Sequence, residues 1–295
     1  MGFFSTLVPL LENFSSEVTP VINIVDSGLD EHFLKSLKSF LKDHPKKPIL
    51  KIRKFPTELV EPFRKQTYYM NRDLFRVSTL SKIALPYIFP DCEFGVYLDC
   101  DIYVQKDFAQ LLQYQNGKSH FYAVQDRYIK SISHPVENID SELFGTDPDA
   151  PYFNGGFFVM NLKGFDRNAY WDTINRVGSK AVLSWEDQSL MNITLCNKWE
   201  PICESWNRMV WPEHAEYSFP KKDINYHFFG GQKPWSFSPA LSIGLVPKFY
   251  KILKENPIEG FDIPTINRPH SLWWIKNFFV STFTKLTKRG KQNPS

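Results

Sequence analysis

The chain has 295 residues and a formal net charge of +3, and 42% of its residues are hydrophobic and 16% aromatic. This length is enough for one large domain with a well-buried core, while the moderate charge and many aromatic side chains exclude an intrinsically disordered chain. The nearly balanced charge also argues against a protein that binds nucleic acid through its bulk charge. No apolar run reaches the roughly 18 residues that span a bilayer, which favours a soluble or peripheral protein.

The spacing of apolar residues predicts helices that alternate with short strands over the first third of the chain. Helices are predicted over residues 3–14, 30–41, 71–88, 168–178 and 187–196. Strands are predicted over residues 21–25, 49–52, 95–98 and 157–161, and a long loop over 133–151. This alternation is typical of an α/β fold in which helices flank a mostly parallel sheet.

The four cysteines, Cys92, Cys100, Cys196 and Cys203, include no pair with CxxC spacing. Four cysteines in a chain of this length are too few for a disulfide-based scaffold, which favours buried thiols in a reducing compartment. The N-terminus lacks a basic segment ahead of its apolar residues, so it does not resemble a signal peptide. The sequence therefore predicts a cytoplasmic protein.

Two carboxylates, Asp99 and Asp101, follow directly on the apolar strand predicted at 95–98. The carboxyl ends of strands form the edge at which open α/β sheets bind ligands. If the chain bends at Cys100, both carboxylates face the same way and can hold a divalent cation that bridges two phosphates. A pair of solvated loop acids is the alternative, and the motif alone leaves both open.

Two further segments place polar groups beside predicted elements. Residues 154–156, Asn-Gly-Gly, precede the strand at 157–161, and their glycines allow a ligand to approach the backbone closely. Asp187 and Gln188 begin the helix predicted at 187–196. Taken singly, the first segment also fits a simple turn, and the second fits a capping box that starts at Ser184.

A cluster of polar and aromatic residues at 226–235 contains His227, Gly230 and Lys233. An imidazole can complete a metal site that carboxylates begin. Glycine amides and a lysine ammonium group suit the oxygens of a diphosphate. The alternative is a buried histidine in an aromatic turn.

In their order along the chain, these four motifs resemble those of family 8 glycosyltransferases, the group that includes glycogenin and bacterial lipopolysaccharide galactosyl- and glucosyltransferases. The resemblance runs from about residue 3 to about residue 250. It implies a GT-A fold with a Rossmann-like sheet, a UDP-sugar donor and a bound Mn²⁺ or Mg²⁺. It also implies sugar transfer with retention of the anomeric configuration.

The resemblance further implies a role for each motif residue. It implies that the metal is bound by Asp99, Asp101 and His227. It implies that the donor is bound by Lys82, Asp99, Asp101, Asn154, Gly155, Gly156, Gly230 and Lys233. Asp187 and Gln188 match catalytic positions, with Gln188 near the reactive anomeric carbon, and Asp126 matches a residue that borders the acceptor pocket. Lys82 stands where the family usually has arginine, so the charge is kept but bidentate geometry is lost.

The expected domain covers residues 1–267 and departs from the family at its start. Family members open with a strand and a turn that binds the nucleoside, whereas here the first predicted helix follows Met1 almost directly. We therefore expect a domain without that first strand. Either the natural start lies upstream, or another segment takes the place of the strand.

The remaining residues, 268–295, form a tail with six Lys or Arg residues and no acid. Within it, residues 271–291 combine Trp and Phe with Lys and Arg, which suits a helix in an anionic membrane interface. A helix docked on the body is the alternative. The tail thus predicts a peripheral location on the cytoplasmic face of a membrane.

Together these features predict an enzyme that moves a galactose or glucose unit from a UDP-sugar to a saccharide or glycolipid acceptor. Such a reaction belongs to polysaccharide or lipopolysaccharide synthesis, and it would not involve nucleic acid. The alternative is a non-catalytic nucleotide- or saccharide-binding protein that keeps the fold without full donor binding, which the expected absence of the first strand motivates.

Overall fold

A computed structural model describes residues 1–26, 28–56, 59, 80–137, 139–180, 183, 186–211 and 214–263. The helix expected over 71–88 therefore falls partly outside the described residues, and the Ser184 cap and the 268–295 tail lie outside them entirely. The described chain forms two compact units. Unit 1 contains Met1–Phe14, Cys100–Asp107 and the described residues from Asn207 onward, and unit 2 contains Ser15–Asp99 and Phe108–Trp206.

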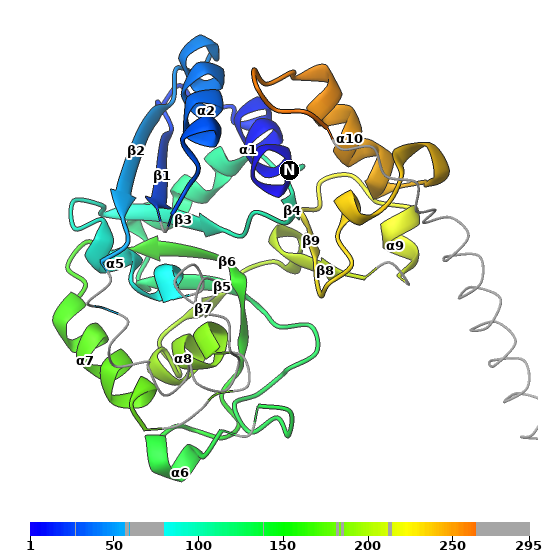
Figure 1. Ribbon diagram of the computed structural model, residues 1–295. Coiled ribbons are helices and arrows are strands. Elements are labelled where there is room, and N and C mark those ends of the chain that lie inside the picture. Colours follow the sequence, from blue (N-terminus) through cyan, green and yellow to red (C-terminus); the bar gives the residue numbers. More distant parts are fainter. Residues whose placement is uncertain are drawn as a thin grey trace, which may run out of the picture. The chain divides into compact units, whose positions relative to one another are not determined.

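Unit 2 is built on a four-stranded sheet (Figure 1). Its strand order is β3 (Phe94–Leu98), β6 (Phe153–Asn161), β5 (Phe121–Gln125) and β7 (Glu200–Pro201). All nine residues of β6 are buried, as expected for a strand covered on both faces. The strand thereby fixes the position of the Asn-Gly-Gly segment at its start.

The helices and strands confirm an α/β fold, but the sheet is mixed rather than mostly parallel. β6 runs antiparallel to both β3 and β5, while β5 and β7 are parallel. A parallel neighbour needs a crossover connection, usually a helix. The segment between β5 and β6 supplies only the four-residue helix α6 (Ser141–Phe144) among its described residues, so the chain returns antiparallel.

A separate pair of parallel strands, β1 (Val21–Asp26) and β2 (Ile49–Lys54), also belongs to unit 2. The helix α2 (Glu31–Asp43) connects them, which gives a βαβ arrangement. Asp30 caps this helix by accepting hydrogen bonds from the backbone N–H groups of His32 and Phe33. Leu37 and Leu41 are buried on one face of the helix, which confirms the predicted amphipathic pattern.

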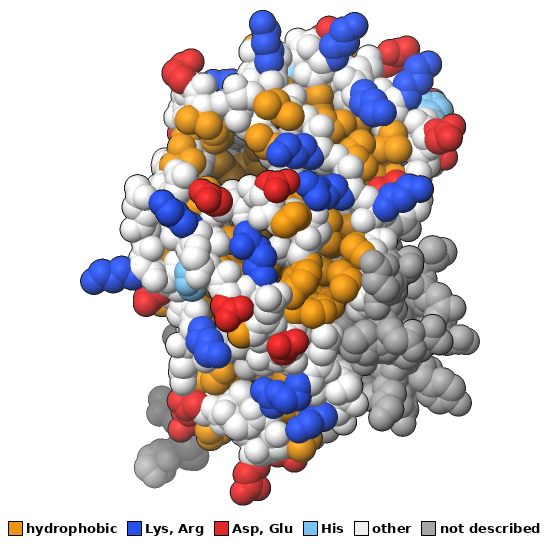
Figure 2. All heavy atoms as spheres, turned by 90° about the vertical axis from the view of Figure 1, so that its left-hand side faces the viewer, with side chains coloured by type: hydrophobic (Ala, Val, Ile, Leu, Met, Phe, Trp, Pro, Cys, Tyr) orange, Lys and Arg blue, Asp and Glu red, His pale blue; other side chains and the backbone are white. Residues whose placement is uncertain are grey.

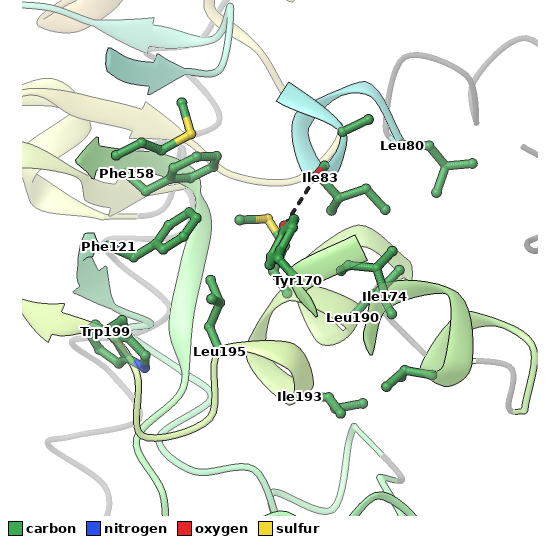
Figure 3. Close-up of a cluster of buried hydrophobic side chains, with 14 of the residues drawn as sticks. Leu80, Ile83, Phe121, Phe158, Tyr170, Ile174, Leu190, Ile193, Leu195 and Trp199 are labelled. Atoms are coloured by element: carbon green, nitrogen blue, oxygen red, sulfur yellow. Dashed lines mark hydrogen bonds between the residues drawn. The ribbon is translucent and has the colours of Figure 1, made fainter. Parts of the chain in front are cut away.

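The main core of unit 2 lies between the sheet and two helices, α7 (Arg167–Gly178) and α8 (Glu186–Thr194). Figure 3 shows Tyr170 of α7 and Leu190 of α8 among the core side chains, with Phe121 and Phe158 of the sheet. The Tyr170 hydroxyl donates a hydrogen bond to the Ile83 carbonyl at 3.2 Å. This packing holds α8, and with it Asp187 and Gln188, on the sheet. Shorter elements of the unit are α5 (Leu85–Ile88), η2 (Phe108–Asn116) and η3 (Glu204–Trp206).

Unit 1 contains a three-stranded sheet in the order β4 (Ile102–Tyr103), β9 (Tyr226–Phe228) and β8 (Arg208–Val210). The helices α1 (Gly2–Asn13) and α10 (Leu245–Glu255) pack together, and α1 also contacts β4. Thr6 of α1 donates a hydrogen bond to the Ile102 carbonyl at 2.8 Å. The remaining elements are α9 (Ala215–Ser218), η4 (Pro234–Ser236) and η5 (Pro239–Leu241).

Three further findings bear on the expectations from the sequence. On the face seen in Figure 2, Lys and Arg side chains are interspersed with Asp and Glu side chains around apolar areas instead of gathering into one basic patch. Among the described residues, no helix combines the length and the hydrophobicity needed to cross a membrane. None of the four cysteines takes part in a disulfide bond.

Candidate functional site

The carboxyl end of β3 carries a charged cluster in unit 2. Lys82 lies at its centre, with its Nζ atom 2.7 Å from Asp187 Oδ2 and 3.5 Å from Asp99 Oδ1. The same ammonium group donates to the Gly155 carbonyl at 3.3 Å. The Tyr97 hydroxyl donates to Asp99 Oδ1 at 2.5 Å. One buried lysine therefore links the end of β3, the start of α8 and the Asn-Gly-Gly segment.

Burial and charge act in opposite directions on this cluster. Burial by itself lowers the pKa of Lys82, but Asp187 and Asp99 outweigh it, so the pKa lies well above its ordinary value. Burial raises the pKa of Asp187, and the lysine opposes that change. Asp187 lies in the first turn of α8, and its carboxylate pairs with Lys82, a partner that helix-capping patterns do not include.

The Gln188 carboxamide is held at both of its ends. Its Oε1 atom accepts hydrogen bonds from the Gly155 backbone N–H at 2.8 Å and from Asn154 Nδ2 at 3.2 Å. Its Nε2 atom donates to Asp126 Oδ2 at 3.3 Å. Asn154 completes the arrangement, because its Oδ1 atom accepts from the Gly156 N–H at 3.0 Å. Residues from β6, α8 and the end of β5 thus converge.

Asp126 is 1% exposed, and both of its carboxylate oxygens accept hydrogen bonds. Oδ1 accepts from the backbone N–H groups of Tyr128 and Ile129, at 2.8 and 3.0 Å. Oδ2 accepts from Asn154 Nδ2 at 3.0 Å as well as from Gln188. The carboxylate predicted to border an acceptor pocket therefore contacts protein groups.

Behind this cluster lies a buried network that the sequence did not reveal. Glu137 is fully buried, and its Oε2 atom accepts hydrogen bonds from the Tyr152 hydroxyl at 2.9 Å and from the Ser189 hydroxyl. On the next turn of α8, Asn192 accepts from the Phe153 N–H at 2.8 Å and donates to the Phe153 carbonyl at 2.9 Å. These bonds tie the first turns of α8 to the beginning of β6.

A second charged cluster lies in unit 1, where Asp101 meets two cationic or potentially cationic groups. His227 Nε2 lies 3.3 Å from Asp101 Oδ1, and Lys233 Nζ lies 2.6 Å from Asp101 Oδ2. Burial raises the pKa of Asp101, but His227 and then Lys233 outweigh it and hold the pKa below its ordinary range. The pairing of Ile102 with His227 across β4 and β9 brings these groups together.

The glycine turn after β9 has a backbone conformation that glycine favours. Gly230 has a φ of +76°, and a Cβ atom there would lie 3.1 Å from Trp211 Nε1. Gly231, by contrast, would meet nothing within 4 Å if it carried a Cβ atom. The requirement for glycine is therefore specific to Gly230.

Only Cys100 separates Asp99 from Asp101 in the sequence. Cys100 and Asp101 form a turn one residue after the end of β3, which supplies the bend at Cys100 that a shared direction of the two carboxylates requires. Asp101 and His227 of unit 1, with Asp99 two residues before Asp101 in the chain, supply residue types that can hold a metal ion. Two carboxylates and one imidazole suit a divalent cation such as Mn²⁺ or Mg²⁺. The buried Asp101 Oδ1 lies 3.3 Å from His227 Nε2 and Oδ2 lies 2.6 Å from Lys233 Nζ, so a bound cation would compete with these protein partners.

A family model described as "Glycosyl transferase family 8" matches residues 3–238, which is more than half of the chain. The chain belongs to glycosyl transferase family 8. It is therefore a glycosyltransferase by family, and the resemblance of its four motifs is confirmed. No relative was found among curated protein sequences.

Solved glycosyltransferase structures share the fold of this family 8 member. WbbM, described as a bifunctional glycosyltransferase, matches with a TM-score of 0.64 and 17% identity over 94% of this chain and 49% of its own. The chain thus spans about half the length of WbbM. The galactosyltransferase LgtC, solved with donor and acceptor sugar analogues, matches with a TM-score of 0.60 and 15% identity over 89% of this chain and 94% of its own. GlyE of Streptococcus pneumoniae TIGR4 matches with a TM-score of 0.57 and 14% identity over 95% of this chain and 60% of its own.

The structure distributes the residues assigned by family 8 resemblance between the two units. Unit 2 brings together Lys82, Asp99, Asp126, Asn154, Gly155, Gly156, Asp187 and Gln188. Unit 1 brings together Asp101, His227 and Lys233, with Gly230 in the same turn. Tyr97 was missed, although strand alternation places it on the same side as Asp99. Glu137 and Ser189 carried no local signal, because their contacts join segments distant in sequence.

Proposed function

We propose that this family 8 protein is a retaining hexosyltransferase. It would move a galactose or glucose unit from a UDP-sugar to a saccharide or glycolipid acceptor in polysaccharide or lipopolysaccharide synthesis. The observation that carries the proposal is the Asp101–His227–Lys233 cluster of unit 1, and Asp99, two residues before Asp101 in the chain, adds a second carboxylate. A diphosphate donor needs such a combination of metal ligands and a cation.

The unit 2 cluster supports recognition of the donor sugar. Lys82, Asp187 and Asn154 offer an ammonium group, a carboxylate and a carboxamide within one hydrogen-bonded cluster. Sugar hydroxyl groups both donate and accept hydrogen bonds, so such mixed groups match them. In this proposal Gln188 lies nearest the anomeric carbon, and Asp126 borders the acceptor pocket.

The chain's own groups also suit the leaving diphosphate. Lys233 would contact its oxygens directly, and the backbone N–H at Gly230 would add an uncharged donor. Asp99, Asp101 and His227 would hold a divalent cation, which, when bound, offsets the negative charge that develops on departing UDP. Lys82 would remain paired with Asp187, because separating buried opposite charges is costly.

The reaction balances without a protein base. The bond between the anomeric carbon and the diphosphate oxygen breaks, and a bond from the acceptor hydroxyl oxygen to the same carbon forms on the same face. The acceptor proton passes to the departing phosphate oxygen. The protein's contribution is to orient donor and acceptor and to stabilise the leaving group's charge.

UDP release from UDP-galactose and UDP-glucose, measured with and without Mn²⁺ and an oligosaccharide acceptor, tests the proposal. We expect acceptor-dependent release that a chelator abolishes. Asp101→Ala should remove it, while a substitution of the exposed Asp149 should not. Release that survives both chelation and Asp101→Ala would overturn the metal assignment.

Calorimetry separates this proposal from the non-catalytic alternative. An enzyme of this type should bind UDP in the presence of Mn²⁺ and turn over a UDP-sugar. A protein that binds UDP–Mn²⁺ but releases nothing from any donor would fit the alternative. A protein that neither binds UDP–Mn²⁺ nor releases UDP would reject the enzyme and favour the alternative in its saccharide-binding form.

We also propose that residues 271–291 bring the protein to the cytoplasmic face of a membrane, because their sequence combines aromatic and basic side chains. Flotation with anionic vesicles tests this for the full chain and for a protein that ends at Pro269. The full chain should float and the truncated protein should not. Equal flotation of both would reject the role of the tail.

A further inference from the structure

The side chain of Gln188 has two chemically different ends of nearly the same shape, so its orientation must be imposed by its neighbours. The Gly155 N–H can only donate, and it lies 2.8 Å from one end of the carboxamide. That end must therefore be Oε1, and the Nε2 group faces Asp126 Oδ2 at 3.3 Å. The orientation follows from the donors and acceptors around it.

Asp126 is suited to impose this orientation because an ionised carboxylate can only accept hydrogen bonds. Each of its two oxygens accepts hydrogen bonds from one pair of donors. Oδ1 faces the N–H groups of Tyr128 and Ile129, and Oδ2 faces the amide groups of Asn154 and Gln188. Since the residue is 1% exposed, water does not replace any of these partners freely.

We infer that Asp126 is a positioning residue that fixes the carboxamide orientation of Gln188, with Oε1 toward Gly155 and Nε2 toward Asp126. The inference rests on the proposed function only for its catalytic consequence. The orientation itself is a property of the folded protein. It goes beyond an acceptor-binding role for Asp126, because both oxygens already accept from protein donors.

The isosteric substitution Asp126→Asn isolates this effect, because it replaces one acceptor oxygen by a donor. If the new NH₂ group faces Tyr128 and Ile129, it meets two donors. If it faces Asn154 and Gln188, the glutamine must turn its oxygen toward residue 126 and its NH₂ group toward the Gly155 N–H. Each arrangement leaves donors facing donors, so the Gln188 orientation is lost.

A second substitution restores the balance and makes the inference specific. In Asp126→Asn/Gln188→Glu, the carboxylate at 188 accepts from Gly155, Asn154 and the new NH₂ group, while the oxygen at 126 accepts from Tyr128 and Ile129. Asn154 Nδ2 loses its acceptor at residue 126 but keeps the one at residue 188, so most of the lost hydrogen bonds are regained. Gln188→Glu alone instead places two carboxylates face to face, which is unfavourable.

Thermal unfolding of the four proteins in this cycle tests the inference without any activity assay. We expect both single variants to melt below the wild type and the double variant to recover at least half of the loss in Tm seen for Asp126→Asn. Asp30→Asn is the matched control, because Asp30 also accepts from the N–H groups two and three residues ahead but does not touch Gln188. No recovery from Gln188→Glu is expected in that background.

Kinetics give the second readout. Orientation of Gln188 should matter more in the transition state than for donor binding, so Asp126→Asn should lower kcat by about 10- to 100-fold with little change in the KM for the nucleotide sugar. If the loss of Tm in the double variant equals the sum of the losses in the two single variants, the inference is overturned. Recovery of Tm in the double variant, together with a wild type that turns over no nucleotide sugar, would instead reject the proposed function and keep the orientation role.

Discussion

The two clusters of polar residues differ in how their charges are balanced. In unit 2, Lys82 and Asp187 form a buried pair, and the neutral carboxamides of Asn154 and Gln188 bond to each other and to Asp126. In unit 1, a single carboxylate, Asp101, lies beside Lys233 and His227. The unit 2 cluster has its partners built into the fold, whereas the unit 1 cluster is dominated by charge.

In the proposed reaction, this difference would correspond to two separate roles. Groups that orient a sugar must be fixed in advance, because a small displacement misaligns the reacting atoms. Groups that hold a metal ion and a diphosphate exchange partners when the ligand binds or leaves, so charge matters more than one fixed geometry. The following substitutions test that contrast, from the largest expected effect to the smallest.

Lys82→Met should destabilise the protein most strongly. It leaves the buried Asp187 carboxylate without its 2.7 Å partner, and breaking a buried ion pair costs about 3–5 kcal/mol. Urea unfolding measures the change, with Lys180→Met on an exposed helix end as the control. Lys82→Arg should lose less, because it keeps the charge. Equal stability of the two methionine variants would show that the pair is not a structural element.

Asp101→Asn should affect catalysis more than folding. It removes one negative charge from the proposed metal set, and the loss of one strong electrostatic contact to a developing charge costs about 10²- to 10³-fold in kcat. The rate of UDP release at saturating Mn²⁺ measures it. The exposed Asp149→Asn serves as the control. A rate within twofold of wild type (about 0.4 kcal/mol) would contradict the assignment.

Lys233→Gln should weaken nucleotide binding without abolishing it. The ammonium group is partly exposed and shares its charge with Asp101, so its removal should raise the Kd for UDP about tenfold, or ~1.4 kcal/mol. Calorimetry at two salt concentrations measures the change. The contribution of Lys233 should shrink at high salt, because screening weakens charge–charge attraction. Unchanged affinity at low salt would remove Lys233 from the diphosphate site.

Glu137→Gln should change the pH dependence of stability by a small amount. Burial raises the pKa of Glu137 above its ordinary 4.5, although hydrogen bonds from Ser189 and Tyr152 oppose the change. The folded protein thus holds this proton more tightly than the unfolded chain. The resulting stability is present below pH 4.5 and is lost as pH rises through the raised pKa.

The Tm of wild type minus that of Glu137→Gln should therefore fall between pH 4 and pH 7. Glutamine does not titrate, so the variant supplies the baseline. The exposed Glu142→Gln provides the matched control and should track the wild type. A difference that stays constant across this range would show that burial does not control the protonation of Glu137.

Sequence patterns predicted the helices and strands well where the interactions that form them join residues close in the chain. The helix α2 was predicted over residues 30–41 from its apolar spacing, and Asp30 caps it. β3 and the turn that follows it were predicted from an apolar run that stops at Asp99. The expected mostly parallel sheet was wrong for unit 2, where β6 runs antiparallel to β3 and β5, because the side-chain pattern of a strand does not determine its direction.

The candidate site divides in the same way. The residue types that suit a metal and a diphosphate, and their order along the chain, were present in the sequence and sufficed to indicate the family. The tertiary structure decided which groups meet: Lys82 with Asp187, Asp126 with Gln188 and Asp101 with His227. The two members of each pair lie far apart along the chain. They meet because the burial of apolar surface between the sheet and the helices brings their segments together. The side chains brought together in this way then take the orientations in which each buried donor meets an acceptor.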